Sequence, residues 1–160
     1  MTKSEYIKSF MPTSYLFQIT NTPAALTRMI DIVRPERYDE KLTADAFSLR
    51  ENIAHLADWE ETCLDRIATA VEYPGKAVPN YDVDARATEH HFAKKDIHHE
   101  LEVFDNRRRD TMAYLLGLAD DDWTKTVVHP SRGEITGKEM VEYIVGHDMY
   151  HLHQVSQYLS

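Results

Sequence analysis

Three histidines occupy a seven-residue stretch near the end of the chain: His147, His151 and His153, in the segment HDMYHLHQV. If this segment is helical, His147 and His151 lie one turn apart on the same face, with about 6 Å between their β-carbons. Two neutral imidazoles at this spacing can bind one divalent ion, each nitrogen lying about 2.1 Å from it. His153 lies roughly 200° around the helix from His151 and points elsewhere. The spacing therefore suggests part of a metal site.

A second interpretation of the same pair involves no metal. The chain contains nine histidines, so an HxxxH spacing can arise by chance. Each ring would then lie at the edge of the apolar face of its helix and form one hydrogen bond. The residues of this segment alone leave both interpretations open.

A third ligand would have to come from another helix, and His55 is the candidate. It lies at the edge of an apolar stripe formed by Leu49, Ile53, Leu56, Trp59, Cys63 and Ile67. Taken alone, His55 is also explained as a half-buried helix histidine. A groove that collected His55 with His147 and His151 would leave a coordination position open for water or substrate, which is typical of catalytic rather than structural sites.

Two polar residues near these histidines are candidates for supporting roles. Asp58, one turn after His55, is a weak catalytic candidate, because a carboxylate there can orient an imidazole or act on a metal-bound water. A surface carboxylate is an equally good interpretation. Gln154, three residues after His151, is either a residue behind a ligand or an ordinary polar bundle residue.

Three further residues close to the histidines have simpler interpretations. Trp59 is either the wall of a substrate pocket or part of the core, and Cys63 is interpreted as core. Gly146 costs about 1 kcal/mol in a helix interior relative to alanine. It either relieves crowding beside His147 or allows close helix packing.

The elements that position these residues are predicted from proline and glycine positions and from apolar residues recurring every three or four positions. Four helices are expected: from about Tyr6 or Pro12 to Val33, from Ser48 to about Glu72, from His91 to Leu116, and from Thr136 to about Leu159. Pro23 either kinks the first helix or begins a new one.

Capping signals support the ends of these helices. Ser48 with Glu51, and Thr136 with Glu139, form capping boxes. Gly117 is expected to end the third helix in the left-handed conformation. Residues 119–135 are expected to form a loop, with a short extended piece at 126–128 as one option. The chain is thus predicted to be all-α, a single four-helix bundle over residues 1–160, and the connection after residue 72 is long enough to cross the bundle.

Composition limits the partners. Eighteen basic and 27 acidic residues give a net charge of −9, which disfavours nucleic acid. The run Arg107, Arg108 and Arg109 is interpreted as a solvated helix face. No segment has the length of a membrane span or the pattern of a signal peptide. Cys63 is the single cysteine, so no internal disulfide can form, and a cytoplasmic location is expected.

Several segments together resemble the DinB/YfiT-like superfamily. Those with the most specific patterns carry the three histidines: AHLADWEETCLDRI at 54–67 and GHDMYHLHQVSQYL at 146–159. Looser similarity extends over TPAALTRMI at 22–30, RRRDTMAYLLGLADDDW at 107–123 and HPSRGEIT at 129–136. The resemblance implies a four-helix bundle in which His55, His147 and His151 bind a metal ion and His153 does not.

The resemblance also implies a cofactor and a type of reaction. It suggests zinc or nickel, a small-molecule substrate and a possible homodimer. Two types of chemistry are implied: metal-dependent hydrolysis, or transfer and isomerisation with a low-molecular-weight thiol as co-substrate. Because the sequence offers no general base stronger than Asp58, thiol transfer is slightly favoured.

Two other functions compete with a metalloenzyme. A non-catalytic bundle, in which a metal only ties two helices together, would act as a binding or stress-response module. A ferritin-like dimetal oxidase requires Glu-x-x-His pairs. The chain contains no Glu-x-x-His, which argues strongly against this third possibility.

Overall fold

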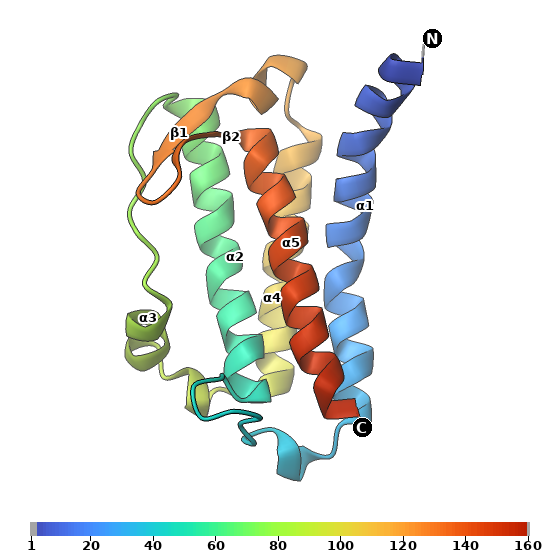
Figure 1. Cartoon of the computed structure of the whole chain (residues 1–160), viewed down its shortest axis with the longest axis vertical. Helices are drawn as coiled ribbons and strands as arrows, with labels where there is room; N and C mark the ends of the chain where they lie inside the picture. The colour runs from blue at the N-terminus through green and yellow to red at the C-terminus, as the bar shows by residue number, and fades with distance from the viewer. Residues whose placement is uncertain (1–2, 160) are drawn as a thin grey trace.

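A computed structural model describes residues 3–159, with side chains described from residue 15 onward, and its main feature is a bundle of four long helices (Figure 1). These are α1 Lys3–Ile32, α2 Leu49–Glu72, α4 Ile97–Leu116 and α5 Gly137–Ser156. The smaller elements are α3 Val83–Glu89, the 3₁₀ turns η1 Pro35–Arg37, η2 Phe92–Lys94, η3 Asp120–Thr124 and η4 Gln157–Leu159, and the strands β1 Thr126–His129 and β2 Gly133–Thr136. The predicted four-helix bundle is confirmed.

The long helices do not alternate simply up and down. In Figure 1, α1 and α5 both descend, whereas α2 and α4 both ascend. The connection between α2 and α4 therefore returns along the length of the bundle, as its length predicted. Each of α1 and α2 packs against both α4 and α5. As a result α2 and α5, which carry the three candidate histidines, are neighbours.

Capping fixes where the site-bearing helices begin. The Ser48 side chain accepts a hydrogen bond from the Glu51 N–H, and the Glu51 carboxylate accepts one from the Ser48 N–H. Thr136 and Glu139 form the same reciprocal pair at the start of α5. Both predicted capping boxes are confirmed. In α1 the helix continues through Pro23, so that proline lies inside one helix and does not begin a second.

The third long helix ends at Leu116 as predicted, but its first residue and the conformation of its C-terminal cap differ from the prediction. It begins at Ile97 rather than His91, because the Asp96 side chain accepts a hydrogen bond from the His99 N–H and caps the helix there. The backbone of His91 is left-handed, with φ 52°, which interrupts any helix through that residue. Gly117 ends α4 with φ −87°, in the right-handed region, so the predicted left-handed cap is wrong.

The expected loop at 119–135 contains a two-stranded antiparallel hairpin. The extended piece predicted at 126–128 is confirmed as β1, which pairs with β2, a strand that was not predicted. The segment after α2 also joins this hairpin, since the Val78 N–H donates to the Val128 carbonyl and the Val128 N–H donates to the Lys76 carbonyl. The hairpin is thereby held beside the end of α2 (Figure 1).

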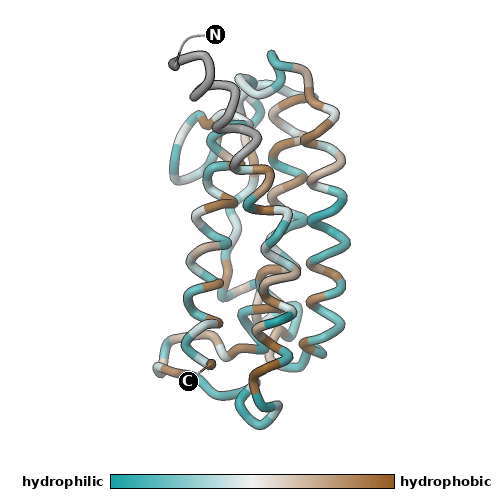
Figure 2. Tube along the Cα trace, turned by 90° about the vertical axis from the view of Figure 1, so that its right-hand side faces the viewer, coloured by the Kyte–Doolittle hydropathy of each residue, from teal (hydrophilic) through white to brown (hydrophobic). Residues whose placement is uncertain are grey.

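Apolar residues recur along every long helix, as Figure 2 shows, and they form two core clusters. One cluster includes Leu26, Ile30, Leu49, Ile53, Leu56, Phe104 and Val155. The other includes Ile19, Trp59, Cys63, Ile67, Leu115, Val127 and Ile144. A layer of buried charged side chains, described below, lies between them along the helices. Among residues 3–159, no helix is long and apolar enough to cross a membrane.

Candidate metal centre

The structure brings together the three histidines predicted as ligands. The Nε2 atom of His147 lies 3.0 Å from Nε2 of His55 and 3.1 Å from Nε2 of His151. Taking one ring nitrogen from each of the three histidines, all of these nitrogens lie within 4.8 Å of one another, and they form one converging group. The exposed His153 does not belong to this group. The helix-face argument that separated His153 from the other two therefore agrees with the structure.

Hydrogen bonds on the far side of two rings fix their tautomers. The Nδ1–H of His151 donates to Asn52 Oδ1 over 2.9 Å, while the amide nitrogen of Asn52 donates to backbone carbonyls. The Tyr81 hydroxyl donates to Asp58 Oδ2, so its oxygen accepts from His55 Nδ1–H over 3.3 Å. Both rings consequently present an unprotonated Nε2 to the centre of the group.

Burial keeps all three rings neutral. His55 and His151 are each 5% exposed, and His147 is half-buried. Burial, with the neighbouring His151, lowers the pKa of His55 to about 3. The same two causes lower the pKa of His147 to about 2, and burial lowers that of His151 to about 4. At neutral pH each ring thus has the protonation state that metal binding needs.

The arrangement of donors fits a divalent cation. Nitrogens bound at about 2.1 Å with tetrahedral angles lie about 3.4 Å apart. The separations of 3.0 and 3.1 Å from His147 Nε2 to the other two rings are a few tenths of an ångström shorter. A proton on His147 Nε2 can satisfy only one neighbouring lone pair at a time. A cation interacts with all three at once, so this group of nitrogens can hold a metal ion.

A pocket of about 1340 Å³ opens onto the three rings. It extends between α2 and α5 and is also lined by the 42–47 loop, by Tyr81 and by the hairpin. The Trp59 ring stacks on His147 with 4.0 Å between ring centroids and lines the pocket, although it also packs in the core. Trp59 thus belongs to the core, as expected, and also lines the pocket, which has room for a small organic molecule.

Asp58 is close to the histidines but contacts them indirectly. Its carboxylate accepts two hydrogen bonds from Arg86, at 2.9 and 2.7 Å, and one from Tyr81 at 2.8 Å. Burial raises the pKa of Asp58, but the Arg86 and Tyr81 hydrogen bonds outweigh it and hold the pKa below its usual range. Asp58 thus orients Tyr81, which in turn orients His55, and its oxygens are already engaged.

The remaining candidates near the histidines have different roles. Gln154 lines the pocket and donates to the Tyr150 hydroxyl. Cys63 is buried in the core as predicted, and burial raises the pKa of its thiol. Gly146 also lines the pocket, and a β-carbon there would meet nothing within 4 Å. Close packing against another helix therefore does not explain Gly146.

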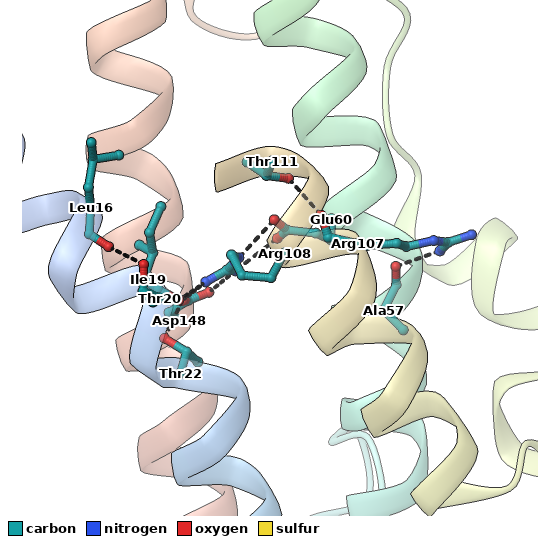
Figure 3. Close-up of polar contacts among 10 residues, drawn as sticks. All are labelled: Leu16, Ile19, Thr20, Thr22, Ala57, Glu60, Arg107, Arg108, Thr111 and Asp148. Carbon is teal, nitrogen blue, oxygen red and sulfur yellow. Dashed lines mark hydrogen bonds and ion pairs between the residues drawn. The ribbon is translucent and has the colours of Figure 1, made fainter. Parts of the chain in front are cut away.

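The largest error of the sequence interpretation concerns Arg108, which does not lie on a solvated face. Figure 3 shows it between Glu60 of α2 and Asp148 of α5. It is 2% exposed, and its five N–H groups donate to the two carboxylates and to the Ile19 carbonyl over 2.6–2.9 Å. Thr22 of α1 donates to the same Asp148. This buried network joins all four long helices beside His147.

Metal-free protein is expected to lose stability as the pH falls below about 6.5. In the folded protein the pKa values of His55, His147 and His151 are about 3, 2 and 4, below the ordinary value of 6.5. Between pH 6.5 and these values the unfolded chain therefore binds more protons than the folded protein. The free energy of unfolding therefore falls with pH, by at most about 4 kcal/mol per pH unit when all three rings contribute. Urea titrations with a chelator at about pH 7 and pH 5.5 measure the slope, and equal free energies at the two values would contradict it.

Comparison with known families places most of the chain in one group. The family model described as the DinB superfamily matches residues 18–155. No curated protein matches the sequence at a significant level.

Solved structures with the same fold have sequences that differ strongly from this one. YfiT from Bacillus subtilis, described as a probable metal-dependent hydrolase with an unusual four-helix bundle topology, superposes with a TM-score of 0.85 at 18% identity, over 99% of this chain and 87% of YfiT. A mycothiol-dependent maleylpyruvate isomerase matches with a TM-score of 0.71 at 13% identity, over 88% of this chain but 58% of the isomerase. A DinB family member from Shewanella denitrificans matches with a TM-score of 0.56 at 18% identity, over 94% of this chain and 86% of that one.

Proposed function

Since the chain belongs to the DinB superfamily, we propose that it is a metal-dependent enzyme that uses His55, His147 and His151 to bind one divalent ion, zinc or nickel. One observation carries the proposal: three neutral imidazoles direct their Nε2 atoms at one another, at the wall of a pocket large enough for a substrate. When bound there, a divalent ion would lower the pKa of a water or thiol and polarise the substrate. Neutral ligands leave the charge of the ion uncompensated, which favours that role.

The residues around the histidines favour a thiol over water as the nucleophile. Hydrolysis benefits from a carboxylate that accepts the proton of water. The group of converging side chains contains no carboxylate, and nearby Asp58 is already bound by Arg86 and Tyr81. A thiol that loses its proton on binding needs no such base during the reaction. We therefore propose transfer of a low-molecular-weight thiol to an electrophilic small molecule, with hydrolysis as the alternative reaction of the same site.

Metal-loaded protein is expected to consume an electrophilic substrate only when a small thiol is supplied. The assay compares a panel of thiols and activated electrophiles with thiol-free hydrolysis of simple esters and amides, each with and without a chelator. His55→Ala is expected to lose the activity, and His153→Ala to keep it, because His153 does not reach the centre. If the metal-loaded protein hydrolyses esters or amides without a thiol, hydrolysis replaces thiol transfer as the proposed reaction. No turnover in either assay would favour a non-catalytic bundle.

A further inference from the structure

The pocket that contains the three histidines has a basic end beside the hairpin. Arg66 lies eleven residues after His55 on α2, which is about three turns, or roughly 16 Å, further along and only about 20° around the helix. Both residues therefore lie on the same face of α2. Arg66 lines the pocket together with His129 and Arg132 of the hairpin. The pocket thus extends from the histidines towards these basic residues.

Arg66 is a buried cation without an acidic partner. It is 8% exposed. One Nη atom lies 3.2 Å from His129 Nε2, and the other donates to the Pro79 carbonyl over 3.0 Å. Its Nε atom is buried without a hydrogen-bond partner, and no carboxylate among residues 15–159 forms an ion pair with it. Arg108, which is similarly buried, has two carboxylates. An uncompensated buried charge is costly, and a bound anion would remove that cost.

Charged groups of both signs line this end of the pocket beside Arg66. The guanidinium of Arg132 lies over the Tyr143 ring at 4.1 Å. Two acidic residues, Glu139 and Glu142, also line the pocket, but Glu139 caps α5 and Glu142 lies 3.7 Å from Lys138. A singly charged anion therefore suits this end better than a doubly charged phosphate.

We infer that Arg66, with Arg132 nearby, binds a carboxylate group of the small molecule whose other end reaches the three histidines. Between the two ends the pocket is lined by Trp59, Cys63 and Met140, which suit an apolar segment. The inference rests on the proposed function only in taking this pocket as the substrate site. Arg66 acts here in binding and specificity, at a distance from the reacting atoms.

The test measures how strongly the pocket prefers an anionic end group. Calorimetric titrations of chelator-treated protein compare octanoate, 1-octanol and octyl phosphate, which share one apolar chain. Octanoate is expected to bind at least about tenfold more tightly than octanol, since hydrogen bonds to charged groups are among the stronger ones. Arg66→Gln should reduce that ratio to about one. Arg109→Gln, which removes the same charge from an exposed position on α4, should leave it unchanged.

The possible outcomes separate a binding role from a structural one. If Arg66 only holds Pro79 and His129 in place, Arg66→Gln will weaken both ligands equally and the ratio will persist, which would overturn the inference. Equal binding of octanoate and octanol by the parent, no octanoate binding at millimolar concentration, or tighter binding of octyl phosphate would also overturn it. If Arg66→Gln does not fold, Arg66→Lys, which keeps the charge without the planar fork, should lower the ratio several-fold. No metal is needed, so failure of the metal proposal would be seen separately.

Discussion

Replacing His147 and His151 together with alanine is expected to abolish stoichiometric binding of a divalent ion. Both side chains direct Nε2 at the same point, so the double variant leaves His55 as the one converging imidazole among the described residues. Loss of a residue that merely supports a ligand already costs 10–100-fold in metal affinity, and loss of two ligands should cost at least about a hundredfold. Elemental analysis of protein purified without a histidine tag, followed by calorimetric titration with zinc and nickel, measures the change.

The same helix provides a matched control for this experiment. His153 is exposed and lies outside the converging group, so His153→Ala should keep metal affinity within about threefold of the parent. His55→Ala, which removes the ligand from the other helix, should weaken binding by at least about tenfold. One ion per chain in the double variant, or equal effects of His55→Ala and His153→Ala, would contradict the assignment of ligands.

The parts of this site that were predictable from sequence depend on local spacing. A helical spacing of four residues places His147 and His151 together whatever the rest of the fold does. Capping boxes at Ser48 and Thr136 likewise depend on residues three positions apart, and both are present. His55 was identifiable because it lies at the edge of an apolar stripe, like the α5 pair. That position indicates a groove shared by the two helices.

The groups behind the histidines could be predicted less well. Tyr81 comes from the irregular connection after α2, where no periodicity shows which side chain reaches His55. Asn52, three residues before His55, carried a usable signal, since it lies on the same face of the helix. The short helix α3 was missed because it buries none of its seven residues, so no apolar period marks it. The strand β2 was missed because it is defined by its pairing with β1 and not by a pattern of its own.

Arg108 shows how charge can mislead when helical register is ignored. Within the run Arg107 to Arg109, charge alone suggested a solvated face. Four buried residues of α4 are spaced around Arg108 at helical intervals. Two lie seven and four residues before it, Leu101 and Phe104, and two lie three and seven residues after it, Thr111 and Leu115. That spacing places Arg108, but not Arg109, on the inner stripe of α4. The position required buried partners, and Glu60 and Asp148 supply them.

Arg108→Ala is expected to destabilise the protein by about 3–5 kcal/mol, because it would leave Glu60 and Asp148 buried without a cation. Arg109→Ala removes an exposed arginine whose ion pair with Asp105 lies on the surface, and should change stability by no more than about 0.5 kcal/mol. Urea unfolding of both variants at neutral pH measures the contrast. Similar free energies of unfolding for the two would show that the network contributes little to stability.

A further variant separates stability from the positioning of the candidate ligands. Replacing the whole network, as Arg108→Met with Glu60→Leu and Asp148→Leu, removes all three charges at once and should recover much of the stability lost in Arg108→Ala. Asp148 is adjacent to His147, and its bonds to Arg108 and Thr22 hold α5 at the level where that histidine meets His55. If the network also sets the ligand geometry, the triple variant will be stable yet bind zinc at least about tenfold more weakly than the parent. Parental affinity in a stable triple variant would restrict the network to a role in stability.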